Sequence, residues 1–311
     1  MNGQILVCLG IAVLAGSFGA KAQSPAQTTF PTPQAAASAL VKAAQSETPD
    51  SLVPILGATM IDALRTGDPA RNKLERQLFV TGAKKRIKVE PDPDDSKRMI
   101  VYVGEVEWPF PAPLVKEGNG WRFDGVAGKE EVADRAIGRH ELGAMAACMD
   151  FVRAQLDYVA EDHDGDGVLE FAQKIISSPG AQDGLYWSND RGEDMSPLGP
   201  FFARAAANAE SAMARNENPE PLFGYYYKVL TRQGPNAKGG ARDFVADGNL
   251  LGGFGLVAWP AEYGKSGIAT FVVSQLGEIY EKDLGSDTAR VATATHAFDP
   301  DGTWKRVKLE D

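Results

Sequence analysis

The clearest pattern in this chain lies in residues 137–171, IGRHELGAMAACMDFVRAQLDYVAEDHDGDGVLEF. Six apolar residues there recur at spacings of three and four: Leu142, Met145, Met149, Val152, Leu156 and Val159. Charged residues occupy the opposite side: Arg139, Asp150, Arg153 and Asp157. This periodicity predicts an amphipathic helix that buries the apolar stripe and exposes the charged side.

A tight acidic loop follows this helix. Its spacing, Asp-x-Asp-x-Asp-Gly, matches positions one, three, five and six of an EF-hand calcium loop. The predicted calcium ligands are Asp162, Asp164, Asp166, the carbonyl of Val168, and Glu170 at position nine. Position twelve is Gln173 instead of the bidentate Glu, which lowers the expected affinity to about 0.1 to 1 mM.

The same residues also fit a turn that ends the helix, with its carboxylates solvated. Three like charges within a few residues repel one another unless a cation neutralises them. His163, between two of the carboxylates, is expected to be a solvated loop residue. Both interpretations of the loop remain open from the sequence.

The first residues predict export. An apolar run from Ile5 to Phe18 is followed by Ala20-Lys21-Ala22, a signal-peptide cleavage pattern, so residues 1–22 are interpreted as a secretory signal. A retained anchor is the alternative. We expect a periplasmic or otherwise extracytoplasmic location. Cys8 is removed with the signal, which leaves Cys148 as a single, buried and inert thiol that has no disulfide partner.

Length and charge narrow the function classes. The 311 residues suit two domains, and a net charge of −10 argues against nucleic acid and anionic membranes as partners. Residues 23–30 form a flexible leader, residues 31–136 an N-terminal α+β domain, and residues 137–311 a C-terminal α+β domain.

The N-terminal domain is expected to be helices followed by a small antiparallel sheet. Thr32-Pro33, Asp50 and Asp68-Pro69 are helix start signals, and the third helix is expected to bury Leu74, Leu78 and Phe79. After Gly82 the spacing of the apolar residues changes from that of a helix to that of strands. Four segments then predict short strands: KKRIKVE, RMIVYVG, PFPAPLVKE and GWRFDG.

The C-terminal domain is expected to be helices followed by an antiparallel meander. LEFAQKIISS predicts a short amphipathic helix, a long polar loop follows, and LGPFFARAAANAESAMARN predicts an Ala-rich helix at residues 198–216. Five segments then predict strands separated by Gly-rich turns: FGYYYKVL, RDFVADG, LLGGFGLVAW, GIATFVVS and GEIYEKDL. A last short helix is expected between Ser286 and Ala294.

Long motifs resemble a known family. They are WPFPAPLVKEGNGWRFD, IGRHEL, DGDGVLEFAQ, PGAQDGLYW, SPLGP, GYYYKVLTRQGPNAKGGA, GGFGLVAWPAEYGKSGIATFVVSQLGEIYEKDLG and the tail around Trp304. Together they are similar to the bacterial family catalogued as domain of unknown function 2950. The resemblance implies an exported bacterial protein and carries over no catalytic or binding residues.

Residues 137–284 also resemble the head domain of type II secretion pseudopilins, in the order helix, variable loop, GYYYKVL strand and Gly-rich β-meander. The pattern departs from that class in the helix, which is too charged to lie in a membrane. Each central Asp or Arg costs about 2.5 to 3.5 kcal/mol in a bilayer. The resemblance therefore implies a soluble pilin-like head and not a filament subunit.

The segment GGFGLVAWPAEYGKSG is a candidate binding surface. Trp259, Glu262 and Tyr263 would present it to a protein or glycan partner of the cell envelope. The alternative is a bent β-ribbon with Trp259 in the core, because strand glycines mark bends.

Enzyme motifs are sparse. The histidines after residue 22 are His140, His163 and His296, without a zinc-protease or serine-hydrolase motif around them. A glycan or peptide hydrolase remains an alternative, with Glu262 paired either with a carboxylate of residues 183–194, such as Asp183, or with Asp247. The sequence favours an uncharacterised exported envelope protein that acts as a non-catalytic interaction or scaffolding module, with calcium as its predicted cofactor.

Overall fold

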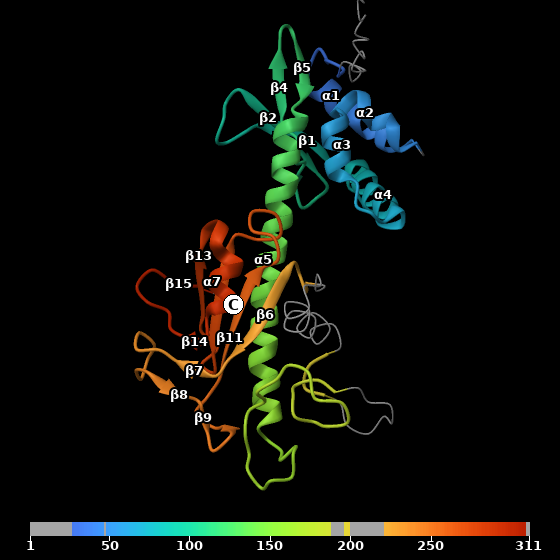
Figure 1. Cartoon of the computed structure of the whole chain (residues 1–311). Helices are drawn as coiled ribbons and strands as arrows, with labels where there is room; N and C mark the ends of the chain where they lie inside the picture. Colours follow the sequence, from blue (N-terminus) through green and yellow to red (C-terminus); the bar gives the residue numbers. More distant parts are fainter. Residues whose placement is uncertain (1–26, 47, 188–195, 200–220, 309–311) are drawn as a thin grey trace, which may run out of the picture. The chain divides into compact units, whose positions relative to one another are not determined.

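The computed structural model describes residues 27–46, 48–187, 196–199 and 221–308 (Figure 1). It confirms an α+β fold, with helices and several antiparallel sheets. The chain divides into two compact units, Met1–Lys129 and Glu130–Asp311. The predicted signal peptide lies outside the described residues, as does most of the leader.

The dividing point falls inside one long helix, α5 (Gly125–Tyr158). The sequence pattern placed the helix start at Ile137, twelve residues too late. The helix begins earlier because the Asp124 carboxylate accepts the backbone N–H groups of Val126 (3.2 Å) and Ala127 (3.3 Å). These bonds cap the first turn of the helix.

The first unit begins with short helices. They are α1 (Pro33–Ala44), the 3₁₀ turn η1 (Pro49–Leu52), α2 (Val53–Leu56), α3 (Ala58–Leu64) and α4 (Pro69–Lys85). Two predicted N-caps are confirmed: Thr32 Oγ1 accepts from Ala35 N (3.1 Å), and Asp68 Oδ1 accepts from Ala70 N (2.8 Å). The predicted buried face of α4 is wrong for Leu74 and Leu78, which are exposed, whereas Phe79 is half-buried and packs on Phe110. Ala83 is also buried.

An antiparallel sheet completes the first unit. Its strands are β1 (Ile87–Pro91), β2 (Arg98–Val103), β3 (Trp108–Pro109), β4 (Leu114–Glu117) and β5 (Gly120–Phe123). The strand order is β1-β2-β4-β5, and β3 pairs with β2. Helix α1 packs against β1, β5 and α4, and Leu40 of α1 and Phe123 of β5 are fully buried.

The second unit is built on a five-stranded antiparallel sheet. Its order is β15-β13-β12-β11-β6. The strands are β6 (Tyr225–Leu230), β11 (Gly255–Pro260), β12 (Ala269–Ser274), β13 (Ile279–Asp283) and β15 (Lys305–Arg306). Short strands form two smaller sheets: β7 (Arg232–Gln233), β8 (Arg242–Asp243) and β14 (Ala297–Phe298) in one, β9 (Val245–Ala246) and β10 (Asn249–Leu250) in the other.

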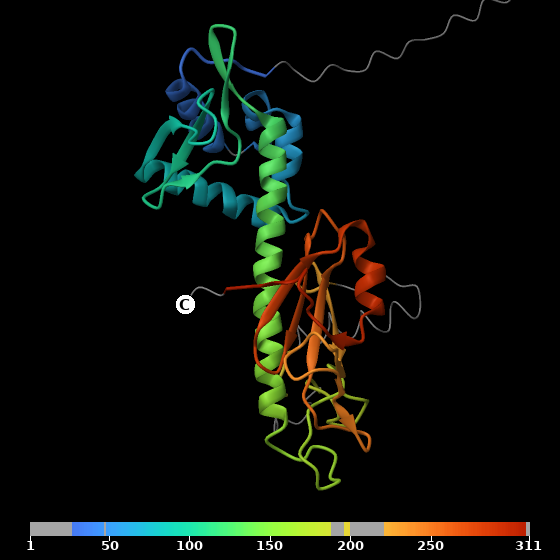
Figure 2. The ribbon, with the colours of Figure 1, turned by 90° about the vertical axis from the view of Figure 1, so that its left-hand side faces the viewer.

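Helix α5 lies along one face of the five-stranded sheet (Figures 1 and 2). Its buried residues differ from the predicted stripe. Val152 is buried, and Met145 and Met149 pack against the same core, as predicted, but Leu142 and Leu156 are 65% and 52% exposed. Small or compact residues face the sheet instead: Ala144, Ala147, Cys148, Phe151, Ala154 and Tyr158. The buried face of α5 is offset from the predicted stripe because small side chains let the helix and the sheet approach closely.

The other face of the sheet is covered by α7 (Thr288–Ala294), which follows the 3₁₀ turn η2 (Gly285–Asp287), and by β14. Helix α7 and α5 lie on opposite sides of the sheet in Figure 2. The three tyrosines of β6 alternate: Tyr225 and Tyr227 are buried toward α5, and Tyr226 packs with Trp259 on the other face. Every residue of β11 is buried, because both faces are covered.

One predicted helix is wrong. LEFAQKIISS is irregular, because tertiary partners take up its backbone groups: Phe171 N donates to Leu250 O (3.0 Å) and Tyr186 N to Ile175 O (2.9 Å). The predicted helix at residues 198–216 falls almost entirely outside the described residues. Among those described, no helix combines the length and the apolar character needed to cross a membrane.

Candidate functional site

The acidic loop brings its three aspartates together. Asp162, Asp164 and Asp166 each offer one carboxylate oxygen, and these oxygens lie within 4.8 Å of one another. All three side chains are exposed. Gly165 and Gly167 have positive φ angles of 78° and 85°, a conformation that favours glycine and curls the backbone around the carboxylates.

The Asp162 carboxylate organises the loop. Its Oδ1 accepts from Gly165 N (2.8 Å) and its Oδ2 from Gly167 N (2.9 Å). Asp166 Oδ1 also accepts from Val168 N (2.7 Å). The bonds from Gly165 and then Gly167 favour the ionised form and lower the pKa of Asp162 below its ordinary value. The loop therefore holds one carboxylate charged by its own backbone.

A distant hairpin, β9–β10, holds the loop in place. Asn249 Nδ2 donates to Asp166 Oδ2 (2.8 Å), and Leu250 N donates to Glu170 Oε2 (2.9 Å). Gln173 Nε2 donates to Gly248 O (2.6 Å). Gln173, which stands where an EF-hand loop has its bidentate Glu, therefore bonds to the hairpin. Sequence reasoning missed Asn249, because no local pattern links residues 83 positions apart.

The end of α5 is tied to the segment that follows the loop. Gln155, fully buried, donates through Nε2 to Ala172 O (2.8 Å) and accepts through Oε1 from Ala172 N (2.9 Å). His163 is half-buried and not solvated as expected, because its ring stacks on Tyr158 with centroids 4.2 Å apart and also contacts Trp187. These contacts fix both ends of the acidic loop.

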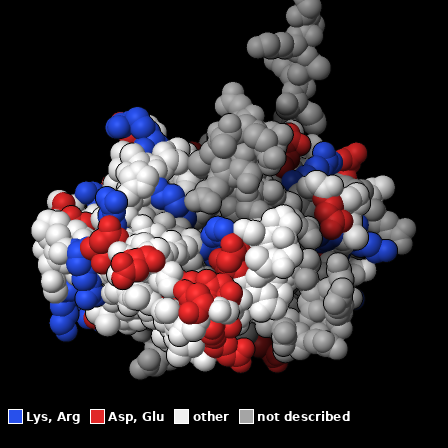
Figure 3. Space-filling model, turned by 60° about the horizontal axis from the view of Figure 1, so that its bottom comes forward, with Lys and Arg blue, Asp and Glu red and all other residues white. Residues whose placement is uncertain are grey.

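Negative charge gathers at this end of the second unit. Figure 3 views this end and shows Asp and Glu side chains side by side on the surface. Glu170 is half-buried beside the aspartates. Burial, followed by repulsion from Asp164 and Asp166, raises the pKa of the Glu170 carboxyl above its ordinary value. A cation would relieve this repulsion.

The second candidate site is the turn between β11 and β12. Trp259 is 2% exposed and packs edge-on against Tyr226, with ring centroids 5.9 Å apart. It is therefore a core residue and offers no surface to a partner. Glu262 and Tyr263 lie in the turn itself, where the Tyr263 side chain is 38% exposed.

Side chains of α5 hold this turn. His140 Nδ1 lies 3.0 Å from Ser266 O, and Glu141 Oε1 accepts from Ile268 N (2.9 Å) and Ala269 N (3.0 Å). Lys265 Nζ forms an exposed ion pair with Glu262 (2.6 Å). The end of the turn that enters β12 is thus held by α5, and Glu262 and Lys265 pair within the turn.

The carboxylates predicted for a hydrolase lie on different segments of the chain. Asp183 accepts from Lys174 Nζ (2.6 Å) and from Ser178 N (2.6 Å). Partial burial opposes its ionisation, but these bonds outweigh burial and hold the pKa of Asp183 at about 2. Asp183 is therefore an ionised structural group. Residues 188–194 of the same loop lie outside the described residues, and Asp247 lies in the β9–β10 turn.

Cys148 of α5 is fully buried in the core. Burial raises the pKa of its thiol to about 12, so the thiolate is absent at neutral pH. The predicted burial of this cysteine is confirmed.

Fold and candidate sites together define an α+β protein of two units with an acidic loop at one end of the second. The chain belongs to the family described as protein of unknown function (DUF2950), whose family model matches residues 27–307. The family predicted from the sequence motifs is confirmed. No curated protein and no solved structure matches the chain, and the resemblance to pseudopilin heads is therefore not confirmed.

Proposed function

We propose that this chain is an exported cell-envelope protein that acts as a non-catalytic interaction module, stabilised by calcium at its acidic loop. The observation that carries the proposal is the convergence of Asp162, Asp164 and Asp166 within 4.8 Å on a loop anchored at both ends. Export rests on the signal-peptide pattern of residues 1–22.

Calcium suits this loop chemically. It takes six to eight oxygen ligands in flexible geometry. The three aspartates supply negative oxygens, and the Val168 carbonyl and Glu170 follow at the spacing of an EF-hand loop. Because Gln173 replaces the bidentate Glu, we expect a dissociation constant of about 0.1 to 1 mM, which suits an extracytoplasmic compartment.

Thermal unfolding of the protein in chelator and in calcium tests this proposal. With a dissociation constant of about 0.1 mM, about 10 mM calcium adds roughly 2.7 kcal/mol of stability, a shift of several degrees in Tm. The Asp164→Ala/Asp166→Ala variant should lose this shift, and magnesium at the same concentration should give a smaller one. Equal Tm values in chelator and calcium would refute the calcium site.

The exposed turn after β11 is the proposed contact surface for an envelope glycan or protein. Tyr263 presents an aromatic face, and its hydroxyl donates to Asp283 Oδ2 (3.3 Å). Because α5 holds the turn, little conformational entropy is lost when a partner binds.

Sedimentation with purified cell-wall glycan tests the contact surface. Tyr263→Ala should reduce the bound fraction severalfold, whereas Leu251→Ala, another exposed apolar residue remote from the turn in sequence, should leave it unchanged. The same assay tests the hydrolase alternative: release of soluble fragments that is lost in Glu262→Gln would replace the binding proposal. Equal binding by wild type and Tyr263→Ala would show that the turn is not the contact surface.

A further inference from the structure

Helix α4 of the first unit, labelled in Figure 1, exposes two leucines. Leu74 and Leu78 are 54% and 62% exposed. They are four residues apart and therefore lie on one side of the helix, opposite the buried Ala83. The two side chains that the sequence pattern placed in the core are thus at the surface.

The turn between β2 and β3 adjoins the same side of α4. Lys85 follows Leu78 by seven residues and so shares its side of the helix. The Lys85 Nζ atom lies 3.3 Å from Glu105 Oε2 in the turn. Val106, the next residue, is 87% exposed. The turn therefore places a third exposed apolar side chain beside the C-terminal end of α4.

Trp108 extends this exposed apolar region. Its ring packs edge-on against Phe110, with centroids 6.4 Å apart, and Phe110 packs against Phe79 of α4 at 5.6 Å. Trp108 is nevertheless 44% exposed. Single apolar residues are ordinary on a protein surface, whereas a group of them marks an interaction site. This group is called the α4 surface and comprises Leu74, Leu78, Val106 and Trp108.

The α4 surface lies in a basic part of the chain. The segment from Pro69 to Arg86 contains one acidic residue, Glu75, and six basic ones: Arg71, Lys73, Arg76, Lys84, Lys85 and Arg86. Glu105 and Glu107 of the adjoining turn pair with Lys85 and Arg86 at 3.3 Å and 3.0 Å. Six basic residues against three acidic ones leave an excess of positive charge. A complementary partner is therefore apolar at its centre and negatively charged around it.

The net charge of the whole chain does not apply to this surface. The second unit, Glu130–Asp311, holds 29 acidic and 17 basic residues. The first unit, Met1–Lys129, holds 13 acidic and 15 basic residues. The acidic character that argues against an anionic membrane as partner therefore belongs to the second unit.

We propose that the first unit docks on an anionic lipid bilayer through the α4 surface, with its four apolar side chains in the headgroup region and the neighbouring Lys and Arg side chains on lipid phosphates. Leucine and tryptophan next to Lys and Arg are typical of helices and surfaces that lie in the membrane interface. Tryptophan in particular is enriched at the level of the headgroups. Each basic residue close to an anionic leaflet adds to the attraction.

Sedimentation of the full chain with lipid vesicles tests the proposal. One set of vesicles contains phosphatidylglycerol and phosphatidylcholine in equal parts, and the other contains phosphatidylcholine alone. All samples contain chelator, because calcium can bridge the carboxylates of the acidic loop to lipid phosphates. Binding should be at least tenfold stronger to the anionic vesicles, because several basic residues face the lipid phosphates. It should fall severalfold in about 0.5 M salt, which screens exposed charges.

Two variants separate the apolar and the basic contributions. Leu74→Gln/Leu78→Gln should weaken binding to the anionic vesicles by about tenfold, because two apolar side chains no longer enter the interface. Lys84→Gln/Lys85→Gln should weaken it by about tenfold as well. All four side chains are exposed, so both variants should keep the fold.

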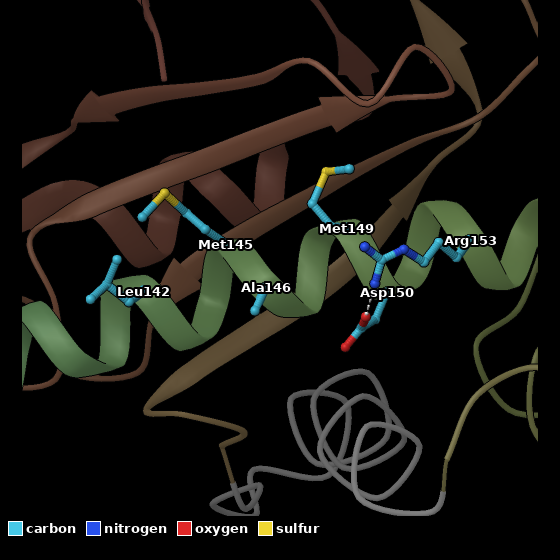
Figure 4. Close-up of a pocket in the computed structure, with 6 residues that line it drawn as sticks. All are labelled: Leu142, Met145, Ala146, Met149, Asp150 and Arg153. Carbon is cyan, nitrogen blue, oxygen red and sulfur yellow. Dashed lines mark hydrogen bonds and ion pairs between the residues drawn. The ribbon is translucent and has the colours of Figure 1, made fainter. Parts of the chain in front are cut away.

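An exposed leucine of the second unit provides the matched control. Leu142 of α5 is 65% exposed and lies near an Asp150–Arg153 ion pair, in which the charges cancel (Figure 4). Leu142→Gln removes as much apolar surface as either α4 substitution but outside a basic environment. It should leave vesicle binding unchanged, and an equal loss in this variant would contradict a specific α4 surface.

Tryptophan fluorescence gives a second readout. Emission of the wild type should shift to shorter wavelength on anionic vesicles, because Trp108 leaves water for the headgroup region. Trp108→Phe keeps an aromatic ring against Phe110 and the other four tryptophans, and it should lose the shift. A shift of the same size in Trp108→Phe would contradict insertion at this site.

Absence of binding to anionic vesicles would overturn the proposal, as would equal binding by the wild type and the two α4 variants. Self-association without lipid that Leu74→Gln/Leu78→Gln abolishes, together with absent vesicle binding, would assign the α4 surface to a protein partner instead. The assays contain neither calcium nor glycan. This inference can therefore fail while the proposed function stands, and the reverse also holds.

Discussion

The acidic loop and the turn after β11 are both exposed, but they are held in different ways. In the loop, the carboxylates that fix the backbone are also the proposed ligands: Asp162 accepts the N–H groups of both glycines. In the turn, His140 and Glu141 of α5 fix the backbone, and the exposed Tyr263 is not among the groups that do so. Substitutions can therefore separate stability from binding in the turn but not in the loop.

The largest expected effect lies beneath the turn. Trp259→Ala should destabilise the protein by about 3 to 5 kcal/mol, because it leaves a cavity in a core covered on both faces. Tyr263→Ala, four residues along and partly exposed, should change stability by less than about 0.5 kcal/mol. Denaturant unfolding followed by circular dichroism measures both. Similar losses of unfolding free energy in the two variants would mean that Tyr263 belongs to the core and that stability and binding cannot be separated in the turn.

A smaller effect is expected from the residue that organises the loop. Asp162→Asn keeps one acceptor for Gly165 and Gly167 instead of two, and should lower Tm in chelator by about two to four degrees, the effect of one ordinary hydrogen bond. The pKa of Asp162 is lowered in the folded state, so its contribution is complete above the ordinary value of 3.8 and is lost as pH falls through the folded value.

Melting curves between pH 7 and pH 2.5 check this prediction. The gap between wild type and Asp162→Asn should be constant down to about pH 4, the ordinary pKa of an Asp carboxyl, and close below it. The calcium shift should be weaker in the variant at every pH. A variant that keeps full calcium binding and loses only stability would show that holding the loop and binding the cation are separable.

The smallest effect has the opposite sign. Glu170→Gln removes a charge that is partly buried and repelled by Asp164 and Asp166, while its amide oxygen can still accept from Leu250 N. In chelator at pH 7 we expect Tm to rise by about one degree. The pKa of Glu170 is raised, so the gap should close as pH falls through that raised value toward the ordinary 4.5, where the wild-type carboxyl is itself neutral.

In calcium the sign should reverse, because Glu170 is then a predicted ligand and its loss weakens binding. Melting of both proteins in chelator and in calcium measures the reversal. A variant that is more stable in both conditions would remove Glu170 from the ligand set.

Sequence patterns predicted elements better than they predicted which face is buried. Thr32 and Asp68 mark helix starts because a cap is a local contact between a side chain and nearby N–H groups. The stripe on α5 was placed by the size of its apolar residues, yet Ala144 and Ala147 are buried and Leu142 is exposed. Gln155 can be buried because both polar atoms of its amide are hydrogen-bonded to the backbone of Ala172. No local sequence pattern predicts that pairing.

The sequence by itself determined the family, the α+β class, and the alternation of aspartates and glycines that curls one loop around its carboxylates. Each depends on neighbouring residues or on long motifs. Only the tertiary structure decided that Trp259 is core, that Asp183 is a structural anion and that Asn249 holds Asp166 from 83 residues away. These outcomes depend on which strand is covered on both faces and on which distant backbone groups need a partner. The spacing of apolar residues along the chain contains no information on which strands are covered or which distant backbone groups are paired.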